Sequence, residues 1–137
     1  MNTINFWPIL VASIIAFVIG AFWYSPLLFG KEWMTLVGIS EKEANKMTFA
    51  TTWKLYVGQF IATLVEFGVL AFILSVTNAR SAADGAIIAF LIWLGFNATE
   101  GVGKLMWEKK PLKLILISSV AMLVSLVIGG VIMGAWK

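Results

Sequence analysis

A single acidic residue, Glu66, lies in the middle of the hydrophobic run 61–72. Thr63, Gln59 and Tyr56 precede it at spacings of three and four residues, so a helix would carry all four side chains on one face. Ionisable residues inside apolar segments are costly to insert, and they mark proton relays and solute pathways. The pattern therefore predicts a group that binds and releases a proton, coupled to the binding or transport of a small solute.

A second polar face follows further along the chain, where Asn97, Glu100 and Lys104 share one side of a helix. At a rise of about 1.5 Å per residue, Asn97 comes closest to the depth of Glu66. We expect Lys104 to pair with Glu100. We also expect the two polar faces to enclose one pocket that opens to the cytoplasm and is capped by Trp93. The candidate binding residues are Glu66, Asn97, Glu100, Lys104, Thr63, Gln59, Tyr56 and Trp93.

A purely structural interpretation of these residues stays open. Glu66 could hydrogen-bond Asn97 as an interhelical clamp, since polar side chains in membrane helices often only join neighbouring helices. Glu100 with Lys104 could be a plain ion pair, and Trp93 could be packing rather than a gate.

Enzymatic chemistry is not expected. The chain has no Cys and no His, which excludes thiol nucleophiles, the usual zinc sites and imidazole acid–base catalysis. No nucleophile, metal-ligand cluster or phosphate-binding loop accompanies the acids. We therefore expect no cofactor and no metal.

The elements that must position these side chains are membrane helices. Of the 137 residues, 61% are hydrophobic and 12% charged, whereas soluble domains carry about 25% charged residues. A bilayer core of about 30 Å needs roughly 20 helical residues, and four apolar stretches reach that length. They are continuously apolar, without the alternation of a spanning barrel. We predict an all-α polytopic membrane protein, a single domain over 1–137, with an antiparallel bundle of transmembrane helices at about 5–24, 53–77, 82–107 and 111–136.

The connection 25–52 should add a short helix in the membrane interface. Ser25 and Pro26 form a start signal, with proline at the first helical position. Gly38 can end this helix in a left-handed cap. Ser40 then fits the N-cap of a second short helix that continues toward the second span.

The basic residues predict the orientation. Eight of the ten Lys and Arg belong to the connections 25–52 and 107–111 or to the helix ends beside them, which is a positive-inside signal. Both termini should face outward from a bacterial inner membrane, and the two connections should face the cytoplasm. The net charge of +3 is thereby explained without a nucleic-acid partner. These basic residues are Lys31, Lys42, Lys46, Lys54, Lys104, Lys109, Lys110 and Lys113.

Small residues indicate close helix packing. Gly130 and Gly134 form a GxxxG motif in the last span. We expect the lipid bilayer to surround the protein. Because four helices make a thin bundle, we also expect the chain to form a homo-oligomer. The alternative is that these small residues pack within one chain.

The segment FWYSPLLFGKEWM, residues 22–34, is the most distinctive stretch of the chain. Together with the opening segment and WLGFNAT, it resembles a bacterial family of small integral membrane proteins, domain of unknown function 1761. The resemblance covers essentially the whole chain. It implies a four-helix membrane protein and no particular activity. The motif is carried by Trp23, Tyr24, Ser25, Pro26, Leu27, Phe29, Gly30 and Trp33.

Overall fold

Four long helical segments form the protein. The computed structural model describes residues 4–136, and over that range the chain consists of helices and turns without a strand. The segments long and apolar enough to cross a membrane are α1 (Phe6–Trp23), α4 (Phe49–Val76), the continuous run of α5 (Ala82–Ile92), η1 (Trp93–Ala98) and α6 (Thr99–Trp107), and α7 (Leu112–Ala135). The predicted all-α fold with four spans is confirmed.

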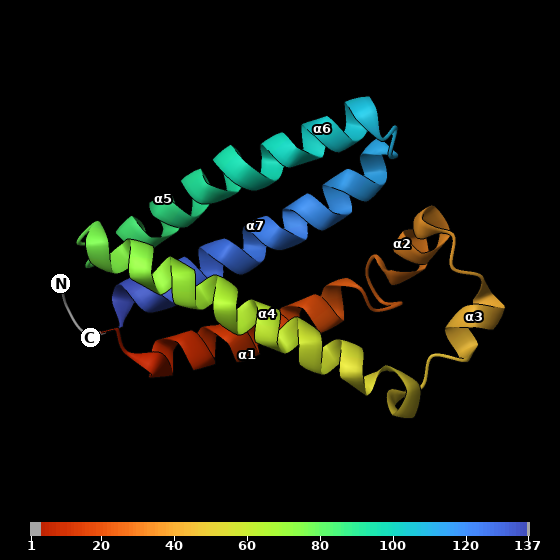
Figure 1. The fold of residues 1–137 in the computed structure, drawn as a ribbon, viewed down its shortest axis with the longest axis horizontal. Helices are drawn as coiled ribbons and strands as arrows, with labels where there is room; N and C mark the ends of the chain where they lie inside the picture. Colours follow the sequence, from red (N-terminus) through yellow and green to blue (C-terminus); the bar gives the residue numbers. More distant parts are fainter. Residues whose placement is uncertain (1–3, 137) are drawn as a thin grey trace.

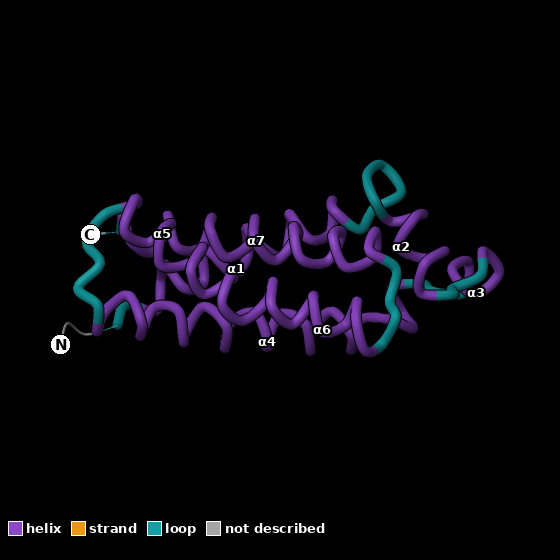
Figure 2. Tube along the Cα trace, turned by 90° about the horizontal axis from the view of Figure 1, so that it is seen from above, coloured by secondary structure: helices purple, strands orange, loops and turns teal. Residues whose placement is uncertain are grey.

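The loops gather at the two ends of the bundle (Figure 2). Both termini and the turn between α4 and α5 lie at one end (Figure 1). The short helices α2 (Gly30–Val37) and α3 (Glu41–Asn45) lie at the other end, with the turn between α6 and α7. We call these the terminal end and the α2–α3 end. Which of them faces the cytoplasm stays a prediction.

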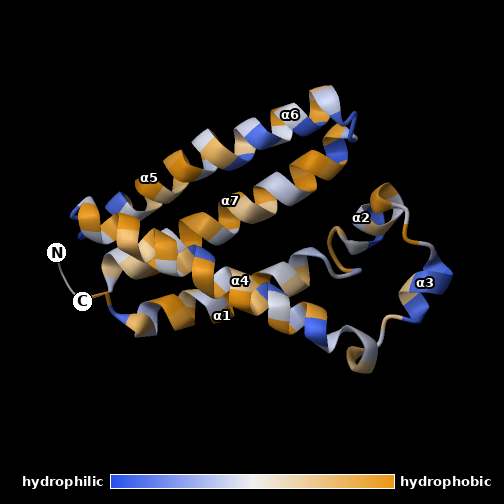
Figure 3. Cartoon of the chain, in the orientation of Figure 1, coloured by the Kyte–Doolittle hydropathy of each residue, from blue (hydrophilic) through white to orange (hydrophobic). Residues whose placement is uncertain are grey.

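Hydrophobic residues dominate the long helices, whereas α3 and the α6–α7 turn are hydrophilic (Figure 3). On α4, Val65 and Val69 point outward and are 63% and 54% exposed, while Phe67 and Leu70 are buried. Apolar surface of this extent is rare on soluble monomers. In a membrane, lipid chains would cover this apolar surface. A helix that is apolar on both its outer and its inner face is typical of a membrane span.

The helix caps of the connection follow the sequence signals. Gly38 adopts φ 83° and ends α2, and the Ser40 side chain accepts a hydrogen bond from the Glu43 N–H at 3.1 Å. Two boundaries differ from expectation. The first short helix of the connection, α2, begins at Gly30 rather than at Pro26. The second, α3, stops at Asn45 rather than continuing toward α4.

The distinctive motif folds α2 back against the bundle. The Phe29 N–H donates to the Trp23 carbonyl at 3.0 Å, and the rings of these two residues lie 4.9 Å apart. The Tyr24 and Trp33 rings meet edge to face at 5.5 Å. The turn over residues 25–29 that these contacts require explains why α2 starts late.

An ion pair joins α2 to the last span. Lys113 Nζ lies 2.9 Å from Glu32 Oε2. Both side chains are about half exposed, so the pair contributes little stability, on the order of 0–1 kcal/mol. It is one of the contacts between α2 and α7.

Gly30→Ala should loosen this corner. A methyl group at position 30 would meet the Tyr24 carbonyl oxygen and lie 2.7 Å from the Ser25 carbonyl carbon. Overpacking of this kind costs about 1–3 kcal/mol. We expect a lower melting temperature in detergent and faster proteolysis between α2 and α4. Gly58→Ala is the control, because a methyl group there meets nothing within 4 Å. Equal behaviour of the two variants would contradict the tight turn.

Glycines bring α5 and α7 into backbone contact. A methyl group on Gly85 would meet the Gly130 carbonyl, and one on Gly134 would meet the Ser81 carbonyl. The GxxxG motif therefore packs within the chain, which leaves it unavailable for self-association. As a result α7 lies between the α5–α6 segment and α1 (Figure 1), and it contacts all three of the remaining spans.

The buried core occupies the terminal half of the bundle. Phe67 is fully buried at its centre, next to Leu70 and Leu74 of the same helix. Ser13 is also buried, and its hydroxyl donates to the Ile9 carbonyl at 2.7 Å. The other members of the core are Ile9, Ala12, Ala16, Ala89 and Leu126.

Candidate functional site

Glu66 lines a partly open cavity of about 440 Å³ between α1, α4 and α7. The whole predicted polar face of α4 takes part, since Thr63, Gln59 and Tyr56 line the same cavity. From α1 and its C-terminal end come Phe17, Trp23 and Tyr24, and from α7 come Ser118 and Ser125. The first polar face of the sequence therefore forms one surface of a real cavity.

The cavity extends over only half of the bundle. Tyr24 and Tyr56 lie toward the α2–α3 end of their helices, whereas Glu66 and Ser125 lie near mid-length. Beyond Glu66 the next residue, Phe67, is fully buried, and its ring leaves no room for a side chain at Gly129. Glu66 thus lies at the mid-length end of the cavity, where the buried core bounds it, and the cavity extends from there toward the α2–α3 end.

The carboxyl group of Glu66 has no compensating charge in this cavity. Its Oε1 atom is buried and has no hydrogen-bond partner. The Thr63 hydroxyl donates to the Gln59 carbonyl of its own helix at 2.9 Å. No Lys or Arg is among the lining residues, and the other ionisable groups there are Tyr24 and Tyr56. An unpaired acid of this kind is free to exchange a proton or to accept a partner that enters the cavity.

The structure contradicts the clamp between Glu66 and Asn97. The structure has no hydrogen bond between the two side chains, and both Oε1 of Glu66 and Oδ1 of Asn97 are buried without a hydrogen-bond partner. The two residues also line different cavities.

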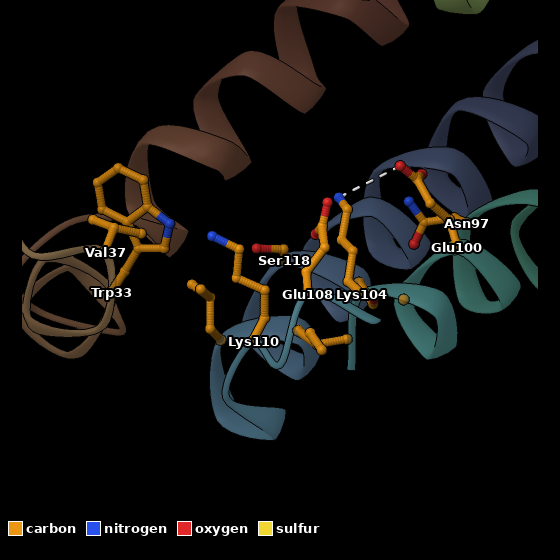
Figure 4. Close-up of a pocket in the computed structure, with 12 residues that line it drawn as sticks. Trp33, Val37, Asn97, Glu100, Lys104, Glu108, Lys110 and Ser118 are labelled. Carbon is orange, nitrogen blue, oxygen red and sulfur yellow. Dashed lines mark ion pairs between the residues drawn. The ribbon is translucent and has the colours of Figure 1, made fainter. Parts of the chain in front are cut away.

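Asn97, Glu100 and Lys104 line a second cavity, of about 240 Å³, bounded by α2, η1, α6 and α7 (Figure 4). Trp33 and Val37 of α2 lie across it from these residues (Figure 4). The predicted ion pair is present, with Lys104 Nζ 3.5 Å from Glu100 Oε1. Both partners are about half exposed, so the pair is weak.

The prediction of one shared pocket between the second and third spans is therefore corrected to two cavities. Ser118 of α7 lines both of them, so α7 is the wall that separates Glu66 from Glu100. The physical reason is the glycine contact between α5 and α7, which leaves α4 to pack mainly on α1.

Trp93 lies outside the lining of both cavities. It begins the π-helical segment η1, and its indole Nε1 donates to the Ser119 carbonyl at 2.7 Å. Trp23 makes a similar bond from α1 to the Ile117 carbonyl at 3.0 Å. Two indoles thus bind carbonyls within one turn of α7, and Trp93 serves packing rather than capping a pocket.

Trp93→Phe removes one of these bonds while keeping an aromatic ring. A hydrogen bond of this kind contributes about 0.5–1.5 kcal/mol, so we expect a modest fall in melting temperature in detergent. Trp107→Phe is the matched control, since Trp107 is 85% exposed. An equal fall in melting temperature in both variants would mean that the hydrogen bond from the Trp93 indole does not stabilise the fold.

Several residues that line the Glu66 cavity were not predicted from the sequence. Phe17 meets Tyr56 and Phe60 edge to face, at 6.2 and 5.8 Å between ring centroids. Ser118 and Ser125 are two of many small residues in α7, and the sequence indicated at most helix packing for Ser125. Trp23 and Tyr24 were predicted as members of the motif and as interfacial aromatics, not as cavity residues. The π-helical segment had no signal of its own, although such segments occur often near functional sites.

These features define a small polytopic all-α membrane protein with a polar cavity that reaches half its depth. The chain belongs to the family described as Protein of unknown function (DUF1761), whose model matches residues 7–134. The family resemblance of the sequence is thereby confirmed. No curated protein and no solved structure matches the chain. Within residues 4–136, no group of three Asp or Glu side chains could hold a metal ion.

Proposed function

We propose that this protein binds a small solute in the Glu66 cavity and couples that binding to a proton carried by Glu66. The observation that supports the proposal is the buried Oε1 of Glu66, which lines the cavity without a hydrogen-bond partner. Polar groups placed at mid-depth in a membrane protein are typical of proton and solute pathways. Asn97 and Glu100 belong to a separate cavity and are not required.

Coupling would follow from competition for a single group. A carboxyl group that holds a proton cannot at the same time pair with a solute, so each would displace the other. Transport across the membrane would additionally require the core around Phe67 to open toward the terminal end. Without such opening, the same cavity would serve binding alone.

Infrared difference spectroscopy tests whether Glu66 carries the proton. Protein in lipid is compared between acidic and alkaline pH, and the carbonyl stretch of a protonated carboxyl group is followed. We expect a band from a group in an apolar setting that is absent from Glu66→Gln and present in Glu100→Gln, where an exposed acid is removed. A spectrum that Glu66→Gln leaves unchanged would reject the proposal.

We further propose that the α2–α3 end faces the cytoplasm of a bacterial inner membrane. The support is the positive-inside distribution, because eight of ten basic residues lie at or near that end. The cavity would then open to the cytoplasm. A homo-oligomer, if it forms, would use outward faces, since Gly130 and Gly134 are occupied within the chain.

A structural or accessory role without transport is the second candidate. One observation favours it: Leu27 and Leu28, beside α2, are 82% and 52% exposed and could rest on lipid or on a protein partner. In that case Glu66→Gln would keep all function, whereas Leu27→Ser with Leu28→Ser would lose a co-purifying partner or membrane attachment of α2.

A further inference from the structure

The Glu66 cavity combines one acid with aromatic rings and lacks a basic residue. Phe17, Trp23, Tyr24 and Tyr56 line it together with Glu66. Aromatic faces attract cations that lie over them. A carboxylate attracts them as well, and more strongly in a setting of low dielectric constant.

The remaining lining fits an apolar body. Ala16, Ala121 and Met122 contribute hydrocarbon surface. A volume of about 440 Å³ lies within the roughly 300–1,000 Å³ of small-molecule sites. An anion would meet the Glu66 carboxylate without any Lys or Arg to balance it. A neutral molecule could bind, but it would have no reason to displace a proton.

We propose that the solute is a small organic cation with an apolar body, of the aromatic ammonium class, which takes the place of the proton on Glu66. This inference rests on the proposed function and adds the chemical class of the solute. The exchange balances in charge: the cation enters, the carboxyl group of Glu66 becomes a carboxylate, and one proton leaves to the water at the mouth of the cavity.

Neighbouring ionisable groups do not provide another explanation for such an exchange. In the cavity, α1 and its C-cap contribute Tyr24, α4 contributes Tyr56, and α7 contributes only uncharged side chains. Lys54 lies outside the lining and sits over the Trp53 ring at 5.7 Å. Lys113 is paired with Glu32. Glu66 is therefore the one lining acid whose proton a cation can replace.

Calorimetric titration with benzyltrimethylammonium tests the proposal on the full-length protein in detergent. This ion is permanently charged, so it cannot supply the proton itself. Titrations in buffers of different ionisation enthalpy count the protons released. We expect close to one proton per bound cation at pH values where Glu66 is protonated, and affinity that rises up to tenfold per pH unit. Glu66→Gln should lose at least tenfold in affinity and should release no proton.

Two matched probes and two further variants complete the experiment. Neopentylbenzene has the same shape without charge, and benzenesulfonate carries the opposite charge. We expect Glu66→Gln to bind the neutral probe as well as the wild type does, and neither protein to bind the anion. Glu66→Asp keeps the charge and should keep the preference for the cation, which guards against a folding defect in Glu66→Gln. Phe17→Leu should weaken cation binding several-fold.

Equal binding of the cation and the neutral probe to the wild-type protein would overturn the inference, as would cation binding that Glu66→Gln leaves intact. Absence of cation binding at every pH would overturn it too. These outcomes are separate from failure of the proposed function, because the infrared band of Glu66 tests proton binding without any solute.

Discussion

Gly130→Ala should severely destabilise the protein. A methyl group at this position would lie 2.9 Å from the Ala89 Cβ and would also meet the Gly85 carbonyl oxygen. Backbone atoms cannot rotate away from the added methyl group as a side chain can. The helices α5 and α7 would therefore have to separate along their length. Overpacking costs about 1–3 kcal/mol and occasionally more, and we expect the upper end. The measurement is the melting temperature of the purified protein in detergent.

Gly68→Ala is the matched control for this variant. Gly68 lies in the interior of α4, and a methyl group there meets nothing within 4 Å. Replacing a helical glycine by alanine stabilises by roughly 0.5–1 kcal/mol, so the two substitutions should have opposite signs. If Gly130→Ala were as stable as Gly68→Ala, α7 would not hold the central place that separates the two cavities.

Phe67→Ala should be the second large change. Phe67 is fully buried between Glu66 and the core of the terminal half. Lipid gives no hydrophobic force between helices, so the loss is one of packing. Removing roughly 100 Å³ at about 24 cal/mol per Å³ of cavity gives about 2–3 kcal/mol. The new space would extend the Glu66 cavity toward the terminal end.

Two measurements check the Phe67 prediction. Thermal unfolding in detergent reports the packing loss, and proteoliposomes containing a pH-sensitive dye report whether protons pass more readily through the variant. Phe72→Ala is the control, because Phe72 is 47% exposed on the outer face of the same helix. A Phe67→Ala protein that is as stable and as proton-tight as Phe72→Ala would contradict the view that Phe67 closes the Glu66 cavity toward the terminal end.

The spans, the caps at Gly38 and Ser40, and the polar face of α4 were predictable from sequence, because each depends on local features. Hydrophobic length sets the spans, and the left-handed Gly38 and the Ser40 cap follow from backbone and side-chain chemistry. The helical period alone puts Tyr56, Gln59 and Glu66 on one face. The structure agrees with each of these predictions.

The neighbour that this polar face meets could not be predicted. Periodicity tells which residues share a face, and it is silent about which helix lies opposite. The missing information lay in Gly85 and Ala89, a small-residue pair in the third span that matches the glycines of the last one. That contact places α7 where the sequence interpretation placed a shared pocket, and it turns Glu66 toward α1 instead.

Cysteine accessibility most directly tests whether the Glu66 cavity opens at the α2–α3 end and is closed toward the terminal end. The chain has no native Cys, so single substitutions give a clean signal. Gln59→Cys and Ser125→Cys place a thiol in the cavity, and Leu70→Cys places one in the buried core. Val69→Cys faces lipid, where a thiolate, the reactive form, does not develop.

A charged, membrane-impermeant thiol reagent is applied separately to each side of sealed vesicles. We expect Gln59→Cys and Ser125→Cys to react only from the side of α2 and α3, and Leu70→Cys and Val69→Cys to stay unreactive from both sides. Reaction of the two cavity positions from the terminal side, or no reaction from either side, would show that Glu66 has no aqueous path to the α2–α3 end.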